Sequence, residues 1–133
     1  GWKKIEDKKI SKTEFKKKLK ETFNVNRIHN YYGMVEQTGS IFLECEKCEY
    51  FTPSIFSDVL IRDKNFQLAK KGEKGLVQLL SILPTSYPGH NIISEDIGEI
   101  AEDDNGCSCS NYGTRFKIHG RIENAEIRGC SDI

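Results

Sequence analysis

The stretch that decides the fold runs Gly75-Leu76-Val77-Gln78-Leu79-Leu80-Ser81-Ile82-Leu83. Its apolar side chains occupy both faces of an extended chain, which is typical of a strand buried inside a sheet. Other short apolar or alternating runs surround it, each bounded by Gly, Pro, Asn or Asp. They cover Ser57–Arg62, Asp96–Ala101, Thr114–His119 and Ala125–Arg128. Five strands at this spacing predict a small twisted sheet or barrel in which residues 75–83 lie centrally.

A helix and a pair of strands are expected nearer the N-terminus. Ser11 and Glu14 have the spacing of a capping box, and the apolar residues that follow lie on one helical face, so residues 11–22 should form an amphipathic helix. Arg27–Tyr32 and Ser40–Glu44 are expected to pair in a hairpin-like arrangement. The predicted fold class is therefore α+β and mainly β, with one N-terminal amphipathic helix followed by a small twisted sheet or barrel.

Composition excludes several classes of protein. The 133 residues suit one domain, 1–133. Lys plus Arg equals Asp plus Glu at 20 each, and the lysines crowded before residue 21 alternate with acids, so we expect no nucleic-acid partner. No apolar run approaches the roughly 18 to 20 residues that cross a bilayer, and no secretory signal is recognisable. These features predict a soluble cytoplasmic protein with no membrane span.

Three glycine-punctuated segments place polar residues just past expected strand ends, where a sheet commonly carries its ligand-binding groups. They are residues 31–39, 85–98 and 119–129. Each has an ordinary explanation when taken singly: a turn with a packed tyrosine, an acid at a turn, and an arginine in a surface salt bridge. Their order along the chain favours a shared function.

Four words in these segments resemble the later motifs of the adenylate-forming superfamily of acyl-CoA synthetases, and most closely its acyl-protein synthetase (LuxE-type) branch. The words are Tyr-Gly-Met-Val-Glu-Gln at 32–37, Leu-Pro-Thr-Ser-Tyr-Pro-Gly-His at 83–90, Glu-Asp-Ile-Gly at 95–98, and Gly-Arg-Ile-Glu-Asn-Ala-Glu-Ile-Arg-Gly-Cys-Ser-Asp at 120–132. The resemblance implies that residues 1–133 are part of the large domain of such an enzyme and the C-terminal portion of a longer acyl-protein synthetase.

The resemblance also implies a site for ATP and Mg²⁺. Tyr32 would line the adenine pocket, with Gly33 in the same nucleotide-binding motif. Glu36 would help to hold Mg²⁺ during catalysis, and a carboxylate oxygen suits that ion. Asp96 would bind the ribose hydroxyls, and Arg121 would contact the ribose or a phosphate.

The chain departs from the superfamily pattern in two ways. Val35 stands where the wider superfamily usually has Thr, and Glu123 or Asn124 stands where Asp commonly follows the Gly-Arg pair. The Ser/Thr/Gly-rich phosphate loop and the lid lysine are not found in this sequence. We therefore expect these residues to be inactive alone, with an upstream part supplying the phosphate loop and the acyl tunnel.

The five cysteines fall into two groups. In an acyl-protein synthetase, Cys130 would be the acyl acceptor, and Arg128 is placed to favour its thiolate; the alternative is an inert terminal thiol. The remaining four thiols are Cys45, Cys48, Cys107 and Cys109. Four sulfurs form the ligand set of a structural Zn²⁺ site, although the second pair is spaced more tightly than usual, and free, partly buried thiols are the alternative.

The function predicted on this basis is ATP-dependent activation of a fatty acid as an acyl-adenylate, followed by transfer to a cysteine thiol and on to an acyl-CoA reductase-type partner protein. One alternative is a phenylacetate-CoA ligase-like acyl-CoA synthetase, in which coenzyme A accepts the acyl group and Cys130 plays no part. The other is a non-catalytic, zinc-stabilised β module that binds a protein partner.

Overall fold

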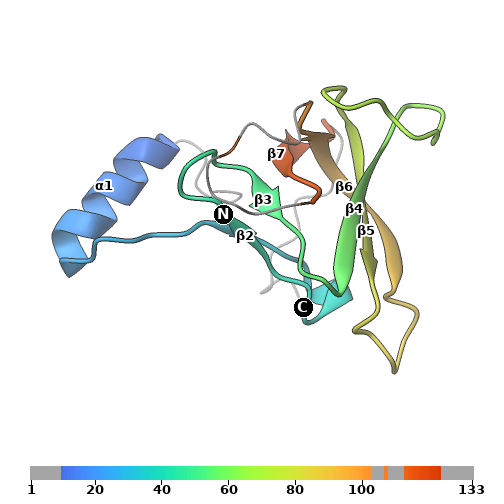
Figure 1. Ribbon diagram of the computed structural model, residues 1–133, viewed down its shortest axis with the longest axis horizontal. Coiled ribbons are helices and arrows are strands. Elements are labelled where there is room, and N and C mark those ends of the chain that lie inside the picture. The colour runs from blue at the N-terminus through green and yellow to red at the C-terminus, as the bar shows by residue number, and fades with distance from the viewer. Residues whose placement is uncertain (1–9, 103–106, 108–112, 124–133) are drawn as a thin grey trace. The chain divides into compact units, whose positions relative to one another are not determined.

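The computed structural model describes residues 10–102, 107 and 113–123 of the chain (Figure 1). It divides into two compact units, one formed by residues 1–28 with 124–133 and the other by residues 29–123. The described part of the first unit contains helix α1 (Lys12–Phe23), and the second contains a seven-stranded sheet. No helix in the described ranges is both long and apolar enough to cross a membrane.

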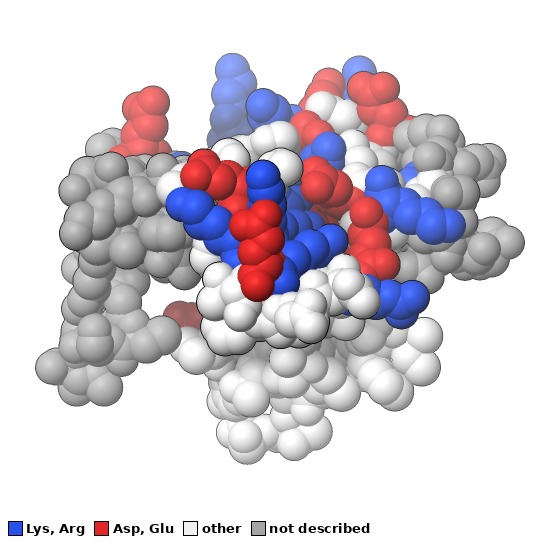
Figure 2. All heavy atoms as spheres, turned by 90° about the vertical axis from the view of Figure 1, so that its left-hand side faces the viewer, with Lys and Arg blue, Asp and Glu red and all other residues white. Residues whose placement is uncertain are grey.

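Helix α1 begins and ends as its sequence predicts. The Glu14 amide donates to the Ser11 side-chain oxygen at 3.1 Å, which confirms Ser11 as the N-cap. Asn24 adopts a left-handed conformation and ends the helix. Its lysines pair with acids one turn away, Lys18 with Glu14 and Lys17 with Glu21. Figure 2 shows acidic side chains interspersed among the basic ones on the side that faces the viewer, so the lysines do not form a purely cationic patch.

The second unit is an antiparallel sheet in the order β1-β2-β3-β7-β6-β5-β4 (Figure 1). Its strands are β1 (Tyr31–Tyr32), β2 (Phe42–Glu44), β3 (Phe51–Thr52), β4 (Ser57–Arg62), β5 (Gly75–Ser81), β6 (Asn91–Ile100) and β7 (Phe116–Arg121), and a short 3₁₀ helix, η2 (Val35–Gln37), follows β1. The strands form an open sheet with β1 and β4 at its edges. This confirms the mainly β fold class and selects the twisted sheet over the barrel.

Most of the predicted strands are present. Strand β4 has the predicted bounds, and β1 pairs with β2 through Tyr32 opposite Phe42, as the hairpin-like arrangement requires. Strand β5 lies inside the sheet between β4 and β6, but it is only one strand from the edge. The central position in the strand order, which the sequence had predicted for residues 75–83, is taken by β7 and not by β5. Strand β3 was not predicted, and the strand expected at residues 125–128 falls outside the described residues.

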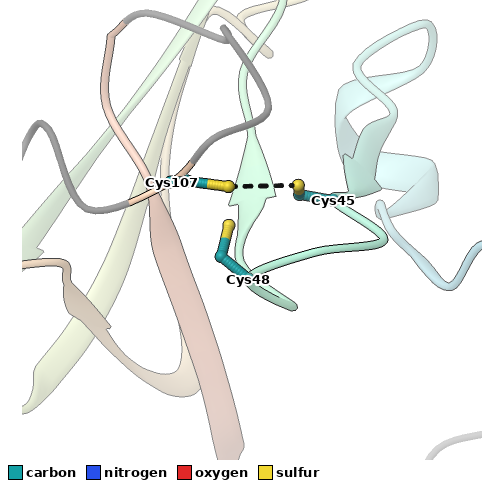
Figure 3. A group of neighbouring side chains, drawn as sticks. All are labelled: Cys45, Cys48 and Cys107. Atoms are coloured by element: carbon teal, nitrogen blue, oxygen red, sulfur yellow. Dashed lines mark hydrogen bonds between the residues drawn. The ribbon is translucent and has the colours of Figure 1, made fainter.

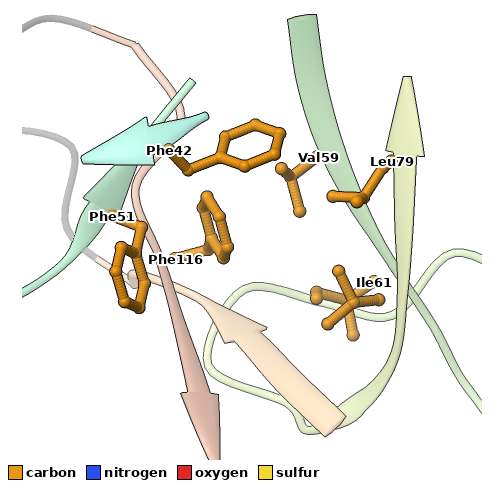
Figure 4. Close-up of a cluster of buried hydrophobic side chains, with 7 residues drawn as sticks. Phe42, Phe51, Val59, Ile61, Leu79 and Phe116 are labelled. Atoms are coloured by element: carbon orange, nitrogen blue, oxygen red, sulfur yellow. The ribbon is translucent and has the colours of Figure 1, made fainter. Parts of the chain in front are cut away.

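The core draws side chains from both ends of the sheet (Figure 4). The buried cluster consists of Phe42, Phe51, Val59, Ile61, Val77, Leu79 and Phe116. Phe116 meets Phe42 edge-on with ring centroids 5.3 Å apart, and the Phe51 centroid lies 5.6 Å away. Strands β3 and β7 pair through a single residue pair, Phe51 with Phe116. We call this junction the seam, because β1, β2 and β3 lie on one side of it and β7, β6, β5 and β4 on the other.

Replacing Phe116 with Ala should destabilise the second unit by about 3 to 5 kcal/mol, because it empties a fully buried ring site and removes the side-chain contacts across the seam. Urea denaturation monitored by circular dichroism measures the loss. Ile55→Ala is the matched control, since Ile55 is 92% exposed and its truncation should change the free energy of unfolding little. Equal effects from the two variants would contradict this assignment of the core.

Candidate functional site

The 3₁₀ helix η2 after β1 and the residue that follows it are hydrogen-bonded to the loop that precedes β6. Gln37 is buried, and its side-chain amide donates to the Gly89 carbonyl at 2.9 Å and to the Leu79 carbonyl at 3.3 Å. The Thr38 amide donates to the Tyr87 hydroxyl at 3.0 Å. The first two motif words, residues 32–37 and 83–90, are therefore in direct contact although they are separated in sequence.

The other two motif words, residues 95–98 and 120–132, also contact each other, and Tyr32 of the first word joins them. The Tyr32 hydroxyl on β1 donates to Asp96 Oδ2 on β6 at 2.6 Å. Asp96 faces Arg121 in the register of β6 and β7, and Arg121 Nε lies 3.6 Å from Asp96 Oδ1. The Arg121 guanidinium also donates to Glu95 Oε2 at 2.8 Å. The structure thus brings together three of the predicted nucleotide-site residues.

Tyr32 is held as a hydrogen-bond donor. Its ring lies about 6 Å, centroid to centroid, from Phe42, Phe51 and Phe116, so the phenol is partly removed from water. Burial raises the pKa of Tyr32 well above its usual range, and the hydrogen bond to the Asp96 carboxylate raises it further. The phenol therefore keeps its proton at pH values where a free tyrosine begins to lose it, and it holds one oxygen of Asp96 in a fixed direction.

The other two predicted residues lie on the connection between β1 and β2. Glu36 is exposed on η2, where its carboxylate is open to solvent. Gly33 is also exposed, and a Cβ at this position would lie 3.2 Å from the Ser40 carbonyl oxygen, so the backbone packs closely there. Glu36 thus shares a loop with Tyr32, and its role toward Mg²⁺ stays a prediction.

A hollow lies elsewhere on the second unit. It is an open depression of about 670 Å³ between the start of β4 and the end of β5, and its lining includes Ile55, Phe56, Ile82 and His90. Tyr32, Asp96 and Arg121 are not among the lining residues. The network of Tyr32, Asp96 and Arg121 is therefore separate from this depression.

Three residues contribute to this arrangement without having been assigned a role from the sequence. Gln37 and Tyr87 join the first two motif words, and Glu95 shares Arg121 with Asp96. All three lie inside the quoted motif words, and this position was the sequence signal that could have identified them. Their partners are between 26 and 52 residues away in sequence, so the pairings themselves required the fold.

A second constellation lies beside the seam (Figure 3). The sulfur atoms of Cys45, Cys48 and Cys107 all lie within 4.8 Å of one another, and those of Cys45 and Cys107 are 3.6 Å apart. Three of the four predicted zinc ligands are therefore brought together. Cys109, the fourth, and Cys130, the predicted acyl acceptor, lie outside the described residues.

The fold and the grouped motifs define an α+β chain with a polar site at the junction of β1, β6 and β7. A family model described as "Acyl-protein synthetase, LuxE" matches residues 1–133, so the chain belongs to this family. It is 26% identical over 134 residues to the long-chain-fatty-acid–luciferin-component ligase of Vibrio harveyi and 25% identical over 137 residues to the enzyme of the same name from Aliivibrio fischeri. No solved structure matches the chain.

The two ligases extend beyond the region that they share with this chain. Each match covers 98% of this chain but 34% of the relative, so the chain spans about a third of the length of these curated relatives. The relationship to a family of ligases is therefore established over nearly all of these residues.

Replacing Tyr32 with Phe should lower the free energy of unfolding by about 1 to 2 kcal/mol, because it removes a hydrogen bond to a charged partner while keeping the ring contacts. Tyr31→Phe is the matched control, since the Tyr31 ring is 66% exposed. Chemical denaturation at neutral pH measures both variants. A Tyr32 variant as stable as the Tyr31 variant would contradict the proposed role of the hydroxyl.

The raised pKa of Tyr32 also predicts a pH dependence. In the unfolded chain a tyrosine loses its proton near pH 10, whereas folded Tyr32 retains its proton at that pH. The stability contributed by protonated Tyr32 is therefore fully present below about pH 10 and is lost as the pH rises toward the folded pKa. The difference in unfolding free energy between the wild type and Tyr32→Phe, measured from pH 8 to 11, should be constant at first and shrink at the alkaline end. A difference that grows with pH would contradict this assignment.

Proposed function

We propose that this chain supplies the adenine, ribose and Mg²⁺ contacts of an ATP-dependent acyl-protein synthetase that activates a fatty acid. The observation that carries the proposal is the network of Tyr32, Asp96 and Arg121, which joins three of the four motif words. The remaining word, residues 83–90, is tied to the first through Gln37. Membership of the acyl-protein synthetase family supports it, as do relatives named for joining a long-chain fatty acid to a luciferin component.

The first step of the proposed reaction is adenylation. An oxygen of the fatty-acid carboxylate attacks the α-phosphorus of ATP, a new phosphorus–oxygen bond forms, and the bond to pyrophosphate breaks. When bound, Mg²⁺ neutralises phosphate charge, and the exposed carboxylate of Glu36 offers the hard oxygen ligand that this ion prefers. Asp96 has the acceptor capacity to bind ribose hydroxyls, and its position is fixed by Tyr32 on one oxygen and by Arg121 beside the other.

The second step transfers the acyl group. The thiolate of Cys130 attacks the acyl carbonyl carbon, a carbon–sulfur bond forms, and the bond to AMP breaks, giving a thioester and free AMP. An acyl-CoA reductase-type protein then takes the acyl group from the thioester. Splitting the transfer in this way lets one enzyme hold an activated acyl group until its partner is bound.

Replacing Asp96 with Asn in the full-length protein should lower fatty-acid-dependent exchange of pyrophosphate into ATP by about 10- to 100-fold, because a neutral amide is a poorer acceptor and disturbs the contacts to Tyr32 and Arg121. Asp58→Asn is the matched control, since Asp58 is an exposed β4 carboxylate whose oxygen accepts the neighbouring Val59 amide. Circular dichroism checks that both variants fold. Full exchange activity in the Asp96 variant would remove this carboxylate from the nucleotide site.

Replacing Cys130 with Ser in the full-length protein should abolish the thiol-linked, hydroxylamine-sensitive attachment of radiolabelled fatty acid while leaving pyrophosphate exchange largely intact, because only the second step requires the thiol. Cys48→Ser is unsuitable as a control here because Cys48 is a predicted Zn²⁺ ligand, so its replacement would alter the predicted metal site as well. Undiminished acyl transfer with coenzyme A as the acceptor would instead identify a phenylacetate-CoA ligase-like enzyme.

A further inference from the structure

The spacing of the clustered sulfurs is that of ligands around a metal ion. Cys45 Sγ and Cys107 Sγ are 3.6 Å apart, and Cys48 Sγ completes a group in which every pair lies within 4.8 Å. A disulfide would place two sulfurs about 2.05 Å apart. Two thiolates on a tetrahedral Zn²⁺, each about 2.3 Å from the ion, lie roughly 3.8 Å apart. The observed separation therefore fits a shared ion much better than a covalent bond (Figure 3).

Cys45 lies in a tight, hydrogen-bonded turn that keeps its side chain buried. Cys45 directly follows β2 and is only 8% exposed. Its backbone is closed into a turn by two hydrogen bonds, from Cys45 N to Tyr50 O and from Glu49 N to Cys45 O. The Lys47 amide donates to Cys45 Sγ at 3.4 Å, so the sulfur atom lies within the turn. Glu49 adopts a left-handed φ of 59°, which is uncommon for a non-glycine residue and brings the chain back after Cys48.

The position of the cluster indicates that a bound ion would link the two sides of the seam. Cys45 and Cys48 lie on the connection between β2 and β3, on one side of the seam, whereas Cys107 lies between β6 and β7, on the other. The sheet itself joins these sides through one residue pair. An ion held by these thiolates links residues 62 positions apart and adds a further connection across the seam.

We propose that Cys45, Cys48 and Cys107 bind a structural Zn²⁺ ion. Cys109, the fourth ligand predicted from the sequence, lies outside the described residues. Thiolates are soft ligands that select zinc over Mg²⁺ or Ca²⁺, and a closed thiolate site leaves no coordination position for a substrate. The site is independent of ATP chemistry. It bears on the proposed function only because Tyr32 and Asp96 lie on opposite sides of the seam that the ion would close.

Metal analysis of the full-length protein, purified without a histidine tag under reducing conditions, tests the site directly. We expect about one zinc per chain, lost on treatment with a strong chelator and restored by Zn²⁺ alone. Added Co²⁺ should give the intense near-ultraviolet absorption of thiolate-to-cobalt charge transfer and the visible bands of tetrahedral geometry. Chelation should also lower the melting temperature, because the ion binds the folded state.

Two serine variants localise the ion. Cys48→Ser should reduce zinc content at least about 10-fold and weaken the cobalt absorption, because it removes a thiolate ligand. Cys130→Ser should keep the full zinc content, since Cys130 belongs to the other thiol group. If Cys48→Ser does not fold, cobalt titration of the chelated wild type still provides the measurement.

The results that would overturn the zinc site are distinct from those that would overturn the enzyme. Wild-type protein without metal and without a cobalt–thiolate band, a Cys45–Cys107 disulfide found by mass spectrometry of the freshly isolated protein, or iron in place of zinc would each reject it. Wild-type protein that contains zinc but shows no fatty-acid-dependent pyrophosphate exchange would count against the nucleotide site alone.

Discussion

The contact between Phe51 and Phe116 is central to the second unit, because in the described strands it is the residue pair that joins the two parts of the sheet. Backbone hydrogen bonding at a single pair is weak compared with the extended ladders between β4 and β5 or between β5 and β6. The seam is therefore held mainly by side chains, through the packed rings of Phe42, Phe51 and Phe116 with Tyr32 beside them. Aromatic burial here substitutes for the missing hydrogen-bond ladder.

The sequence predicted those elements of the fold whose signals are local. The N-cap at Ser11 and the bounded apolar run of β4 depend on neighbours within a few residues, and both were confirmed. Strand β3 has only two residues, too few to display any alternation, and it exists because Phe51 meets β2 and β7. The order of the strands, which puts β7 in the centre, follows from pairings that no local pattern encodes.

The candidate site also has features that local sequence signals predicted and features that only the fold reveals. Motif words supplied Tyr32, Asp96 and Arg121, and the two-residue spacing of Cys45 and Cys48 supplied half of the thiol group, because these signals consist of residue type and spacing. The sequence did not predict that the Tyr32 ring packs into the core while its hydroxyl fixes Asp96, since that bond joins positions 64 residues apart. The assignments of Arg121 to Glu95 and of Gln37 to Gly89 required the fold for the same reason.

The seam and the candidate site are one structural unit. The Tyr32 hydroxyl comes from the β1 side and Asp96 and Arg121 from the other side, so a small opening between β3 and β7 lengthens the 2.6 Å hydrogen bond before it disturbs any extended ladder. Because a catalytic or binding group must be held within a fraction of an ångström of its working position, the site tolerates less movement than the fold does. Substitutions at the seam should therefore impair nucleotide contacts at levels of destabilisation that leave the sheet folded, whereas equally destabilising changes near the β4 edge should leave those contacts in place.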